Sequence, residues 1–212
     1  MSLKDSQYIP SSARALAMSR RVAALYWSIL GPDINEVLDI GCGYGGFAQW
    51  KKNDTRVIGI DRDPLALRTA RGYCEATYEI DLDKQNLPFE TERFDGVLAR
   101  DVLEHLVEPW NAVREIFRVL KPGKVAISSV PMPKPKVVWN DYTHVRGFTK
   151  FAFKKLFEDS GFLIRDLYPI VGFKTSEKLR ITRFLPYLMK LPGANFVGVS
   201  YQMIAVKPGR GE

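Results

Sequence analysis

Residues Val37 to Trp50 read VLDIGCGYGGFAQW, an apolar stretch of strand length followed by closely spaced glycines. An apolar run that leads into a glycine turn and then into amphipathic sequence predicts a strand, a tight turn and a helix. Glycines in such a turn let the backbone approach a ligand without a Cβ clash. The stretch therefore predicts the first strand and the ligand-binding turn of an open α/β sheet.

The rest of the chain repeats this alternation of apolar runs and amphipathic stretches. The alternation is typical of a parallel sheet whose strands are joined by crossover helices. The expected strands are those near 36–40, 56–60, 76–80, 95–99, 125–130, 163–169 and 199–206. We predict an α/β fold with a sheet of about seven strands.

Helix starts are indicated by residues with capping chemistry. Ser11 and Ser12 predict the start of a helix over 12–30, and Asp63 followed by Pro64 predicts a second helix. Pro109 opens a third helix, which we expect to end at Lys121, Pro122 and Gly123. Farther along, Thr149 caps a helix near 149–160, whose apolar face carries Phe153, Leu156 and Phe157, with Lys150, Lys154 and Lys155 pointing elsewhere. Pro131, Pro133 and Pro135 predict an extended loop between these helices.

The composition excludes several classes of protein. The 212 residues contain 46% hydrophobic and 26% charged residues, close to globular averages, so we expect one folded domain rather than a disordered chain. No apolar run is long enough to span a membrane, and the first residues lack the apolar core of a secretion signal, so a cytoplasmic location is expected. Two cysteines and two histidines at unrelated spacings predict neither a disulfide framework nor a metal site.

The positive charge of the chain lies in its last third. Residues 1–130 hold 17 Lys and Arg against 18 Asp and Glu, a net charge of −1, whereas residues 131–212 hold 14 against 6, a net charge of +8. A basic surface suggests polyanionic partners only where it is concentrated. We therefore expect any anionic partner to meet the C-terminal third.

The glycine spacing alone does not select a cofactor. Gly41, Gly43 and Gly46 satisfy the dinucleotide pattern GxGxxG, while Gly41, Gly43 and Gly45 satisfy GxGxG. Asp61 follows the second strand, 20 residues after Gly41, and its two oxygens suit a ribose diol in either case.

Two further acids favour one cofactor. Asp39 lies just before the glycine turn, where it would repel a pyrophosphate and attract an ammonium group. Asp81 follows the third strand, where it suits an adenine amino group while the Leu82 N–H donates to a ring nitrogen. The row of Asp39, Asp61 and Asp81 matches the amine, ribose and adenine of S-adenosylmethionine (SAM). Each acid also has a structural alternative, because Asp39 or Asp81 alone would order a local turn.

The sequence at this point resembles the class I SAM-dependent methyltransferases. VLDIGCGYGG resembles their first motif, VIGIDRDP their second, and FDGVLARDVLEHLVEP followed by EIFRVLKPGK their fourth strand with its helix. DYTHVRGFTKFAFKKLFEDSGF resembles a segment seen in many small-molecule members. The resemblance covers about residues 35–170, and it departs from the family at Lys124, where a second glycine is common.

The resemblance implies a Rossmann-like sheet, mostly parallel with the last strand antiparallel and with helices on both faces. It implies a single domain over 1–212, with a helical segment over 1–34, a cofactor-binding half over 35–130 and an acceptor side over 131–212. The residues it implies at the cofactor are Asp39 and the loop of Gly41, Cys42, Gly43 and Gly45 for the methionyl part, Asp61 and Arg62 for the ribose side, Asp81 and Leu82 for the adenine, and the Arg100 carbonyl for the amino group. Cys42 is expected to pack in the loop without reactivity.

Candidate catalytic residues are the two histidines, since these side chains normally titrate near neutrality. His144 lies in the loop after the fifth strand, where it is expected to orient or deprotonate an acceptor, or to order the entry into the next helix. His105, beside Asp101 and Glu104 after the fourth strand, suits packing or the cofactor surroundings better. Trp139 and Tyr142 suit either a wall of the acceptor site or packing.

Residues 172–197 form an insertion between the last two strands. Its apolar residues have helical spacing and its basic residues lie off that stripe, which fits a lid with a solvated basic face. The alternative is a surface that meets an anionic or lipid-like substrate or a membrane face.

The functional prediction is a SAM-dependent methyltransferase with a small-molecule acceptor, anionic or lipid-like in one interpretation. The alternatives are an NAD(P)-dependent oxidoreductase, a nucleic-acid methyltransferase that uses the basic C-terminal third, and a protein that binds the cofactor without turnover. Nucleic acid is the weaker partner because the phenylalanines of that third fit a buried helix face better than a stacking platform.

Overall fold

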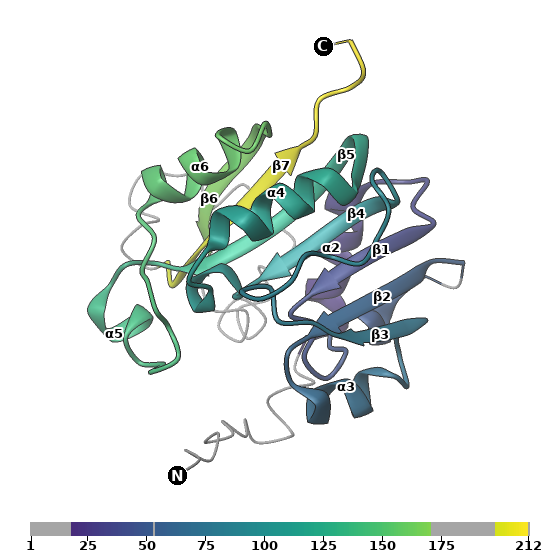
Figure 1. Cartoon of the computed structure of the whole chain (residues 1–212), viewed down its shortest axis with the longest axis horizontal. Coiled ribbons are helices and arrows are strands. Elements are labelled where there is room, and N and C mark those ends of the chain that lie inside the picture. Colours follow the sequence, from purple (N-terminus) through teal and green to yellow (C-terminus); the bar gives the residue numbers. More distant parts are fainter. Residues whose placement is uncertain (1–17, 53, 171–197, 212) are drawn as a thin grey trace.

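The computed structural model describes residues 18–52, 54–170 and 198–211. In chain order its elements are α2 (Arg20–Leu30), β1 (Glu36–Ile40), η1 (Ala48–Trp50), β2 (Arg56–Asp61), α3 (Pro64–Ala70), β3 (Ala76–Glu79), β4 (Phe94–Arg100), η2 (Leu103–His105), α4 (Pro109–Val119), β5 (Leu120–Pro131), α5 (Pro135–Val138), α6 (Lys150–Glu158), β6 (Leu163–Ile170) and β7 (Ser200–Val206). The elements form one sheet with helices packed around it (Figure 1).

The described strands form a seven-stranded sheet in the order β3-β2-β1-β4-β5-β7-β6. The pairs among β1 to β5 are parallel, and β7 pairs antiparallel with both β5 and β6. This confirms the predicted Rossmann-like α/β sheet with its last strand antiparallel. The strand order reverses between β1 and β4, and the carboxyl ends of strands at such a reversal are where open α/β folds bind ligands.

The central strands β1 and β4 are buried on both faces, as expected for strands with near-continuous apolar sequence. Along β1, Leu38 and Ile40 belong to one core cluster and Val37 belongs to the other. The first cluster contains the apolar faces of α4 and α6, and the second contains those of α2 and α3. Figure 1 shows α4 and α6 on the same side of the sheet.

Helix α6 has the face that its sequence predicts. The Thr149 side chain accepts a hydrogen bond from the Ala152 N–H and caps the helix. Phe153 and Phe157 are fully buried, while the lysines of the helix are exposed. The start of α3 is also confirmed, because Asp63 caps it and Pro64 is its first residue.

Three boundaries differ from those expected. The helix predicted over 12–30 does not run unbroken, since Ser19 is an extended N-cap and α2 starts at Arg20; residues 1–17 lie outside the described part. The glycine turn leads only into the single 3-10 turn η1, which ends at Lys51, where the backbone becomes extended. Residues Lys121–Gly123 do not separate α4 from β5 but lie within the strand, where its register with β4 shifts.

The proline-rich segment is more regular than predicted. Pro131 ends β5 and Pro135 is the first residue of the short helix α5, a position where its missing N–H costs nothing. The predicted extended loop is therefore limited to the residues between them. The insertion predicted over 172–197 lies outside the described residues.

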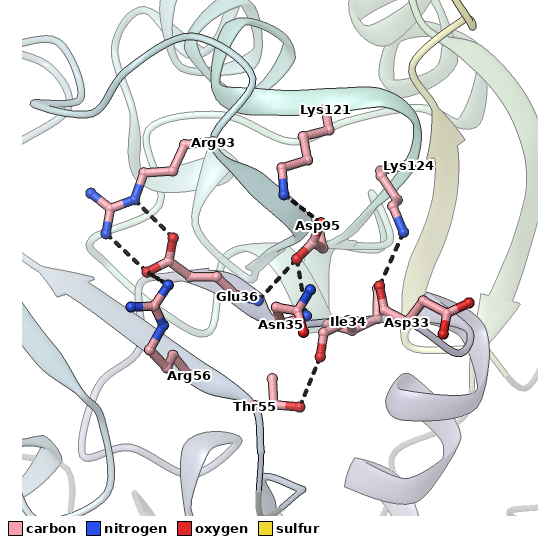
Figure 2. Close-up of polar contacts among 10 residues, drawn as sticks. All are labelled: Asp33, Ile34, Asn35, Glu36, Thr55, Arg56, Arg93, Asp95, Lys121 and Lys124. Carbon is pink, nitrogen blue, oxygen red and sulfur yellow. Dashed lines mark hydrogen bonds and ion pairs between the residues drawn. The ribbon is translucent and has the colours of Figure 1, made fainter.

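The amino end of the sheet carries a network of ion pairs that holds neighbouring elements together (Figure 2). The Asp95 carboxylate accepts hydrogen bonds from the N–H groups of Asn35 and Glu36 and from Lys121 Nζ. Glu36 forms a bidentate pair with Arg93, with both N–O distances at 2.9 Å. Because this network lies at the opposite end from the glycine loop, we regard it as structural.

Candidate functional site

The glycine loop connects the carboxyl end of β1 to η1 and has the backbone that a ligand cradle needs. Gly41 has a φ of +66° and Gly43 a φ of +51°. A Cβ on Gly41 would lie 2.4 Å from Cγ2 of Val102, so the loop packs closely against the turn after β4. A Cβ on Gly43 would meet no atom within 4 Å, so the backbone there borders open space. The loop thus leaves room for a ligand at Gly43 and is held in place at Gly41.

Asp39 places a buried carboxyl group beneath this loop. Its side chain is only 5% exposed, and burial, together with the charge of Asp61, raises its pKa to about 7 despite the opposing charge of Arg100. A carboxyl group with this pKa is poised to ionise when a cation arrives. The site therefore favours a cationic ligand group over an anionic one.

Asp61, at the end of β2, anchors the glycine loop. Its Oδ2 accepts a hydrogen bond of 2.8 Å from the Gly43 N–H, and its Oδ1 accepts one of 2.9 Å from the Asp63 N–H. Burial raises its pKa, and these backbone hydrogen bonds oppose the rise. A carboxylate oxygen has a second acceptor position, so Asp61 retains capacity for ligand hydroxyl groups.

The adenine-side candidates are more exposed. Asp81 Oδ1 accepts from the Asp83 N–H at 3.2 Å and Oδ2 lies 2.7 Å from Lys84 Nζ, so Asp81 orders a local turn as its structural alternative predicted. The Lys84 ammonium lowers the pKa of this carboxyl despite partial burial. Leu82 is half-buried beside it and Arg62 is exposed. The row of acids along β1, β2 and β3 exists, and its role toward adenine stays a prediction.

Arg100 ends β4 at the same edge of the sheet. Its guanidinium lies 5.1 Å from the ring centroid of Tyr26, in α2. The turn that follows is unusual, since Asp101 has a φ of +53° and its Oδ1 accepts a hydrogen bond of 3.0 Å from Ser129 Oγ. A left-handed conformation at a residue with a side chain is strained, and such positions cluster at functional sites. The proposed contact of the Arg100 carbonyl stays a prediction.

The two histidines, far apart in sequence, lie together. The ring centroids of His105 and His144 are 4.6 Å apart, and Nε2 of His144 lies 3.9 Å from Oε1 of Glu104. Glu104 is fully buried, and its burial raises the pKa of the carboxyl group above the usual range. The sequence singled out both histidines but gave Glu104 no role. The signal for Glu104 was an acid directly before a histidine in the turn after β4.

Backbone contacts bring these residues together. The N–H groups of Val145 and Arg146 both donate to the Glu104 carbonyl, at 2.9 and 3.3 Å. Arg146 also donates through its guanidinium to the carbonyls of Leu106 and Val107. The loop after α5 is thus fixed onto η2, so the position of His144 is set by the fold.

Two other features concern possible partner surfaces. Trp139 and Tyr142 are 58% and 71% exposed, so packing in a core does not explain them.

A hollow of about 720 Å³ lies between α2 and η1, away from the acids of the sheet edge; it is lined by Arg20, Ala24, Trp27, Ser28, Gly31, Pro32, Gln49, Trp50, Lys51 and Lys52. Within the described residues, none of the helices has the length and apolar character needed to cross a bilayer.

Sequence comparison with known proteins gives one family and several relatives. A family described as a methyltransferase domain matches residues 38–128. A phosphoethanolamine N-methyltransferase of Arabidopsis thaliana is 34% identical over 140 residues, which are 60% of this chain and 28% of that protein. A ubiquinone biosynthesis O-methyltransferase of Alkalilimnicola ehrlichii is 32% identical over 112 residues, 50% of this chain and 45% of that protein. The chain thus spans less than half the length of these relatives.

Solved structures with the same fold cover nearly all of the chain. A SAM-dependent methyltransferase from Archaeoglobus fulgidus superposes with a TM-score of 0.67 at 20% identity, over 89% of this chain and 95% of the other. The [4+2]-cyclase SpnF superposes with a TM-score of 0.67 at 22% identity, over 90% of this chain and 82% of the other. At these identities the likeness concerns the fold, and the cyclase shows that one fold supports different reactions.

Proposed function

Because the chain belongs to the class I SAM-dependent methyltransferases, whose methyl donor is S-adenosylmethionine, we propose that it transfers a methyl group from SAM to a small-molecule acceptor. The observation that carries the proposal is the buried carboxyl of Asp39 beside a glycine loop with open space at Gly43. An NAD(P) cofactor would bring its pyrophosphate to this loop, where the Asp39 charge disfavours it.

The residues at this edge fit the parts of SAM. Asp39 supplies a carboxylate for the ammonium group of the methionyl part, and the loop of Gly41, Cys42, Gly43 and Gly45 leaves backbone surface for the rest of that part. Asp61, already bound to Gly43 N–H, has remaining acceptor positions for ribose hydroxyls. We assign Asp81 and Leu82 to the adenine, Arg62 to the ribose side and the Arg100 carbonyl to the ammonium.

The chemistry places modest demands on the protein. SAM supplies a sulfonium-activated methyl group, which an acceptor nucleophile displaces in line. What the chain contributes is alignment, which can supply about 7–11 kcal/mol, whereas a positioned base adds about 3–5 kcal/mol. The fixed glycine loop and the fixed position of the 141–146 loop are suited to that alignment.

We propose that His144, with His105 beside it, orients or deprotonates the acceptor. Nδ1 of His144 contacts the Val138 carbonyl, which only accepts, so this nitrogen carries a proton, and in the neutral ring Nε2 has the lone pair. The lone pair faces the side of Glu104 rather than a backbone donor. This arrangement lets Nε2 bind an acceptor hydrogen directly or hold the acceptor through another group.

Support for the acceptor class comes from the relatives. The relatives are named as methyltransferases of phosphoethanolamine, of ubiquinone biosynthesis and of a sterol. The first of these names indicates an anionic acceptor, and the other two indicate lipid-like acceptors. We propose an acceptor of this kind for the acceptor side over 131–212, where the net charge of +8 suits an anionic group. The domain division follows from the same proposal, with 35–130 as the cofactor half.

The test is a methyl-transfer screen. The purified chain is incubated with methyl-labelled SAM and a panel of phosphorylated amines, phenols, isoprenoid quinols and sterols. We expect label in at least one acceptor and formation of one S-adenosylhomocysteine per methyl transferred. Binding of SAM without transfer to any panel member would favour a non-catalytic or cyclase-like role, and protection by NAD but not by SAM would establish the oxidoreductase alternative.

A further inference from the structure

Glu104 is an unusual residue that methyl transfer by itself does not explain. Its carboxylate is 0% exposed, and neither of its oxygens has a hydrogen-bond partner among the described residues. Burying a charged or polar group without a partner destabilises the folded protein. An unpaired buried polar group in a native structure calls for an explanation, and a bound ion is one that also accounts for its neighbours.

The group that completes Glu104 must suit two imidazoles as well. Each of Glu104, His105 and His144 offers one ligand atom, and these three atoms lie within 4.8 Å of one another. Two nitrogens and a carboxylate oxygen are the donor set of three-ligand zinc sites and of open first-row metal sites. A hydrogen-bonding organic group would find only acceptors in this set once both histidines are neutral.

The hydrogen bonds of the histidines leave the correct nitrogens available. Thr143 Oγ1 donates to Asp141 Oδ1 at 2.6 Å, so it accepts from Nδ1 of His105, 3.0 Å away. Nδ1 of His144 contacts the Val138 carbonyl. Each ring thus carries its proton on Nδ1 and offers the lone pair of Nε2. A histidine that binds a metal characteristically donates its other N–H to a carbonyl or carboxylate-linked group in this way.

We propose that Glu104, His105 and His144 form a binding site for a divalent first-row metal ion. The predicted absence of a metal site considered only the spacing of histidines and cysteines along the sequence. The site needs a glutamate that follows β4 and a histidine brought back by the loop after α5. Asp141 supports it indirectly, through Thr143, by fixing the His105 ring.

Metal binding requires a contraction of the cluster. Ligand atoms at about 2.1 Å around a tetrahedral ion lie ~3.4 Å apart, so the widest pair must approach by up to ~1.4 Å. The Glu104–His144 distance of 3.9 Å must shorten by about 0.5 Å. The Glu104 carboxylate can rotate toward the ion, since neither of its oxygens has a hydrogen-bond partner among the described residues.

The site lies next to the proposed cofactor loop. Val102, two residues before Glu104, is the side chain on which Gly41 packs. Three protein ligands leave at least one coordination position for water or for an acceptor oxygen. Resting on the proposed function, the ion would hold an oxygen-bearing acceptor and lower the pKa of its hydroxyl, so that His144 acts as a ligand rather than as a base.

The first experiment measures the ion alone. The chain is purified without a histidine tag, treated with EDTA and titrated with Mn²⁺ while its imidazole proton resonances are recorded. The sequence contains only two histidines, so every imidazole signal reports on this cluster. Mn²⁺ disfavours thiolates, so the buried cysteines do not compete for it. We expect both histidine signals to broaden together below one equivalent and Zn²⁺ to displace the Mn²⁺.

Variants distinguish the site from surface binding. Glu104→Gln, which keeps the shape of the side chain, should weaken Mn²⁺ binding at least tenfold and retain the wild-type fold by circular dichroism. Glu158→Gln, an exposed acid in an ion pair on α6, should leave the affinity unchanged. Unaffected signals, broadening of one histidine only, or equal affinity in Glu104→Gln would overturn the metal site.

The outcome of the metal titration can be distinguished from the outcome of the methyl-transfer screen. Since the titration contains neither SAM nor acceptor, metal binding together with failed methyl transfer would overturn the proposed function alone. Methyl transfer by EDTA-treated protein that shows no saturable Mn²⁺ or Zn²⁺ binding would overturn the metal site alone.

Discussion

The carboxylate of Asp61 accepts a hydrogen bond of 2.8 Å from the backbone N–H of Gly43, so the end of β2 holds the glycine loop of the neighbouring strand β1. Its other oxygen holds the backbone of Asp63 at the start of α3. One side chain thereby connects the loop, two strands and a helix. The same side chain is our candidate for the ribose, so its replacement tests the loop and the cofactor site together.

Asp61→Ala should lower the affinity for SAM by one to two orders of magnitude, since hydrogen bonds to charged groups contribute roughly 1.5–3 kcal/mol. Calorimetric titration with SAM measures the change. Asp63→Ala is the matched control: it removes the cap of α3, which costs about 0.5–2 kcal/mol of stability, but leaves SAM affinity intact. Equal SAM affinities for wild type and Asp61→Ala would refute the assignment.

The affinity for SAM should rise with pH up to about 7. Burial raises the pKa of Asp39 to about 7, whereas pairing with an ammonium group requires the ionised form, so SAM binding at pH 6 releases a proton. Calorimetry at pH 5 to 7 in two buffers of different ionisation enthalpy counts that proton, below the range in which an α-amino group titrates. Asp39→Asn should bind SAM weakly and without this proton release. A pH-independent affinity in the wild type would contradict the role of Asp39.

Asp39 should also make the free protein less stable as the pH rises. Its folded pKa lies above the ordinary value of 3.8, so the stability associated with its protonated form is complete below about pH 4 and is lost as the pH rises through about 7. Urea unfolding of wild type and Asp39→Asn across this range measures the difference. The variant should lack this component of the pH dependence, and identical slopes for both proteins would be inconsistent with a buried, neutral Asp39.

Gly43→Ala should reduce SAM binding more than it reduces stability. Gly43 has a φ of +51° and open space around its missing Cβ, so alanine there costs the strain of a left-handed residue, about 1–2 kcal/mol, and occupies part of the cradle. Gly123→Ala is the matched control, because Gly123 has a φ of +72° and equally open surroundings but lies at the start of β5. Thermal unfolding should show similar losses for both variants, with weaker SAM binding only for Gly43→Ala; equal SAM affinities would place the ligand elsewhere.

Much of the fold follows from local sequence. The seven described strands lie near their expected positions, and the central ones, such as β1 and β4, are apolar runs bounded by turn residues. Caps such as Asp63 and Thr149 act within three residues of themselves, so their effect is visible in sequence. The unexpected start of α2 at Arg20, after the cap Ser19, and the single turn of η1 depend on backbone conformation that residue type alone does not fix.

Some residues of the candidate site could likewise be predicted from local sequence, and others could not. Asp39 and Asp61 were predictable because a parallel sheet brings the ends of adjacent strands to one edge. Glu104 was not, because its role depends on His144, 40 positions later, and on the two hydrogen bonds that fix that loop to the Glu104 carbonyl. Asp81 contacts Asp83 and Lys84 in the structure, as its structural alternative predicted, and its role toward adenine stays a prediction.

The most direct test of the central claim is equilibrium titration of the wild-type chain with SAM, S-adenosylhomocysteine and NAD in parallel. The account predicts saturable one-to-one binding of SAM and of S-adenosylhomocysteine, which share the ammonium, ribose and adenine groups, and no measurable binding of NAD. Binding of NAD with no binding of SAM would contradict it, because the site around the Asp39 carboxyl would then hold a pyrophosphate in place of the ammonium group that the carboxyl pairs with when it ionises.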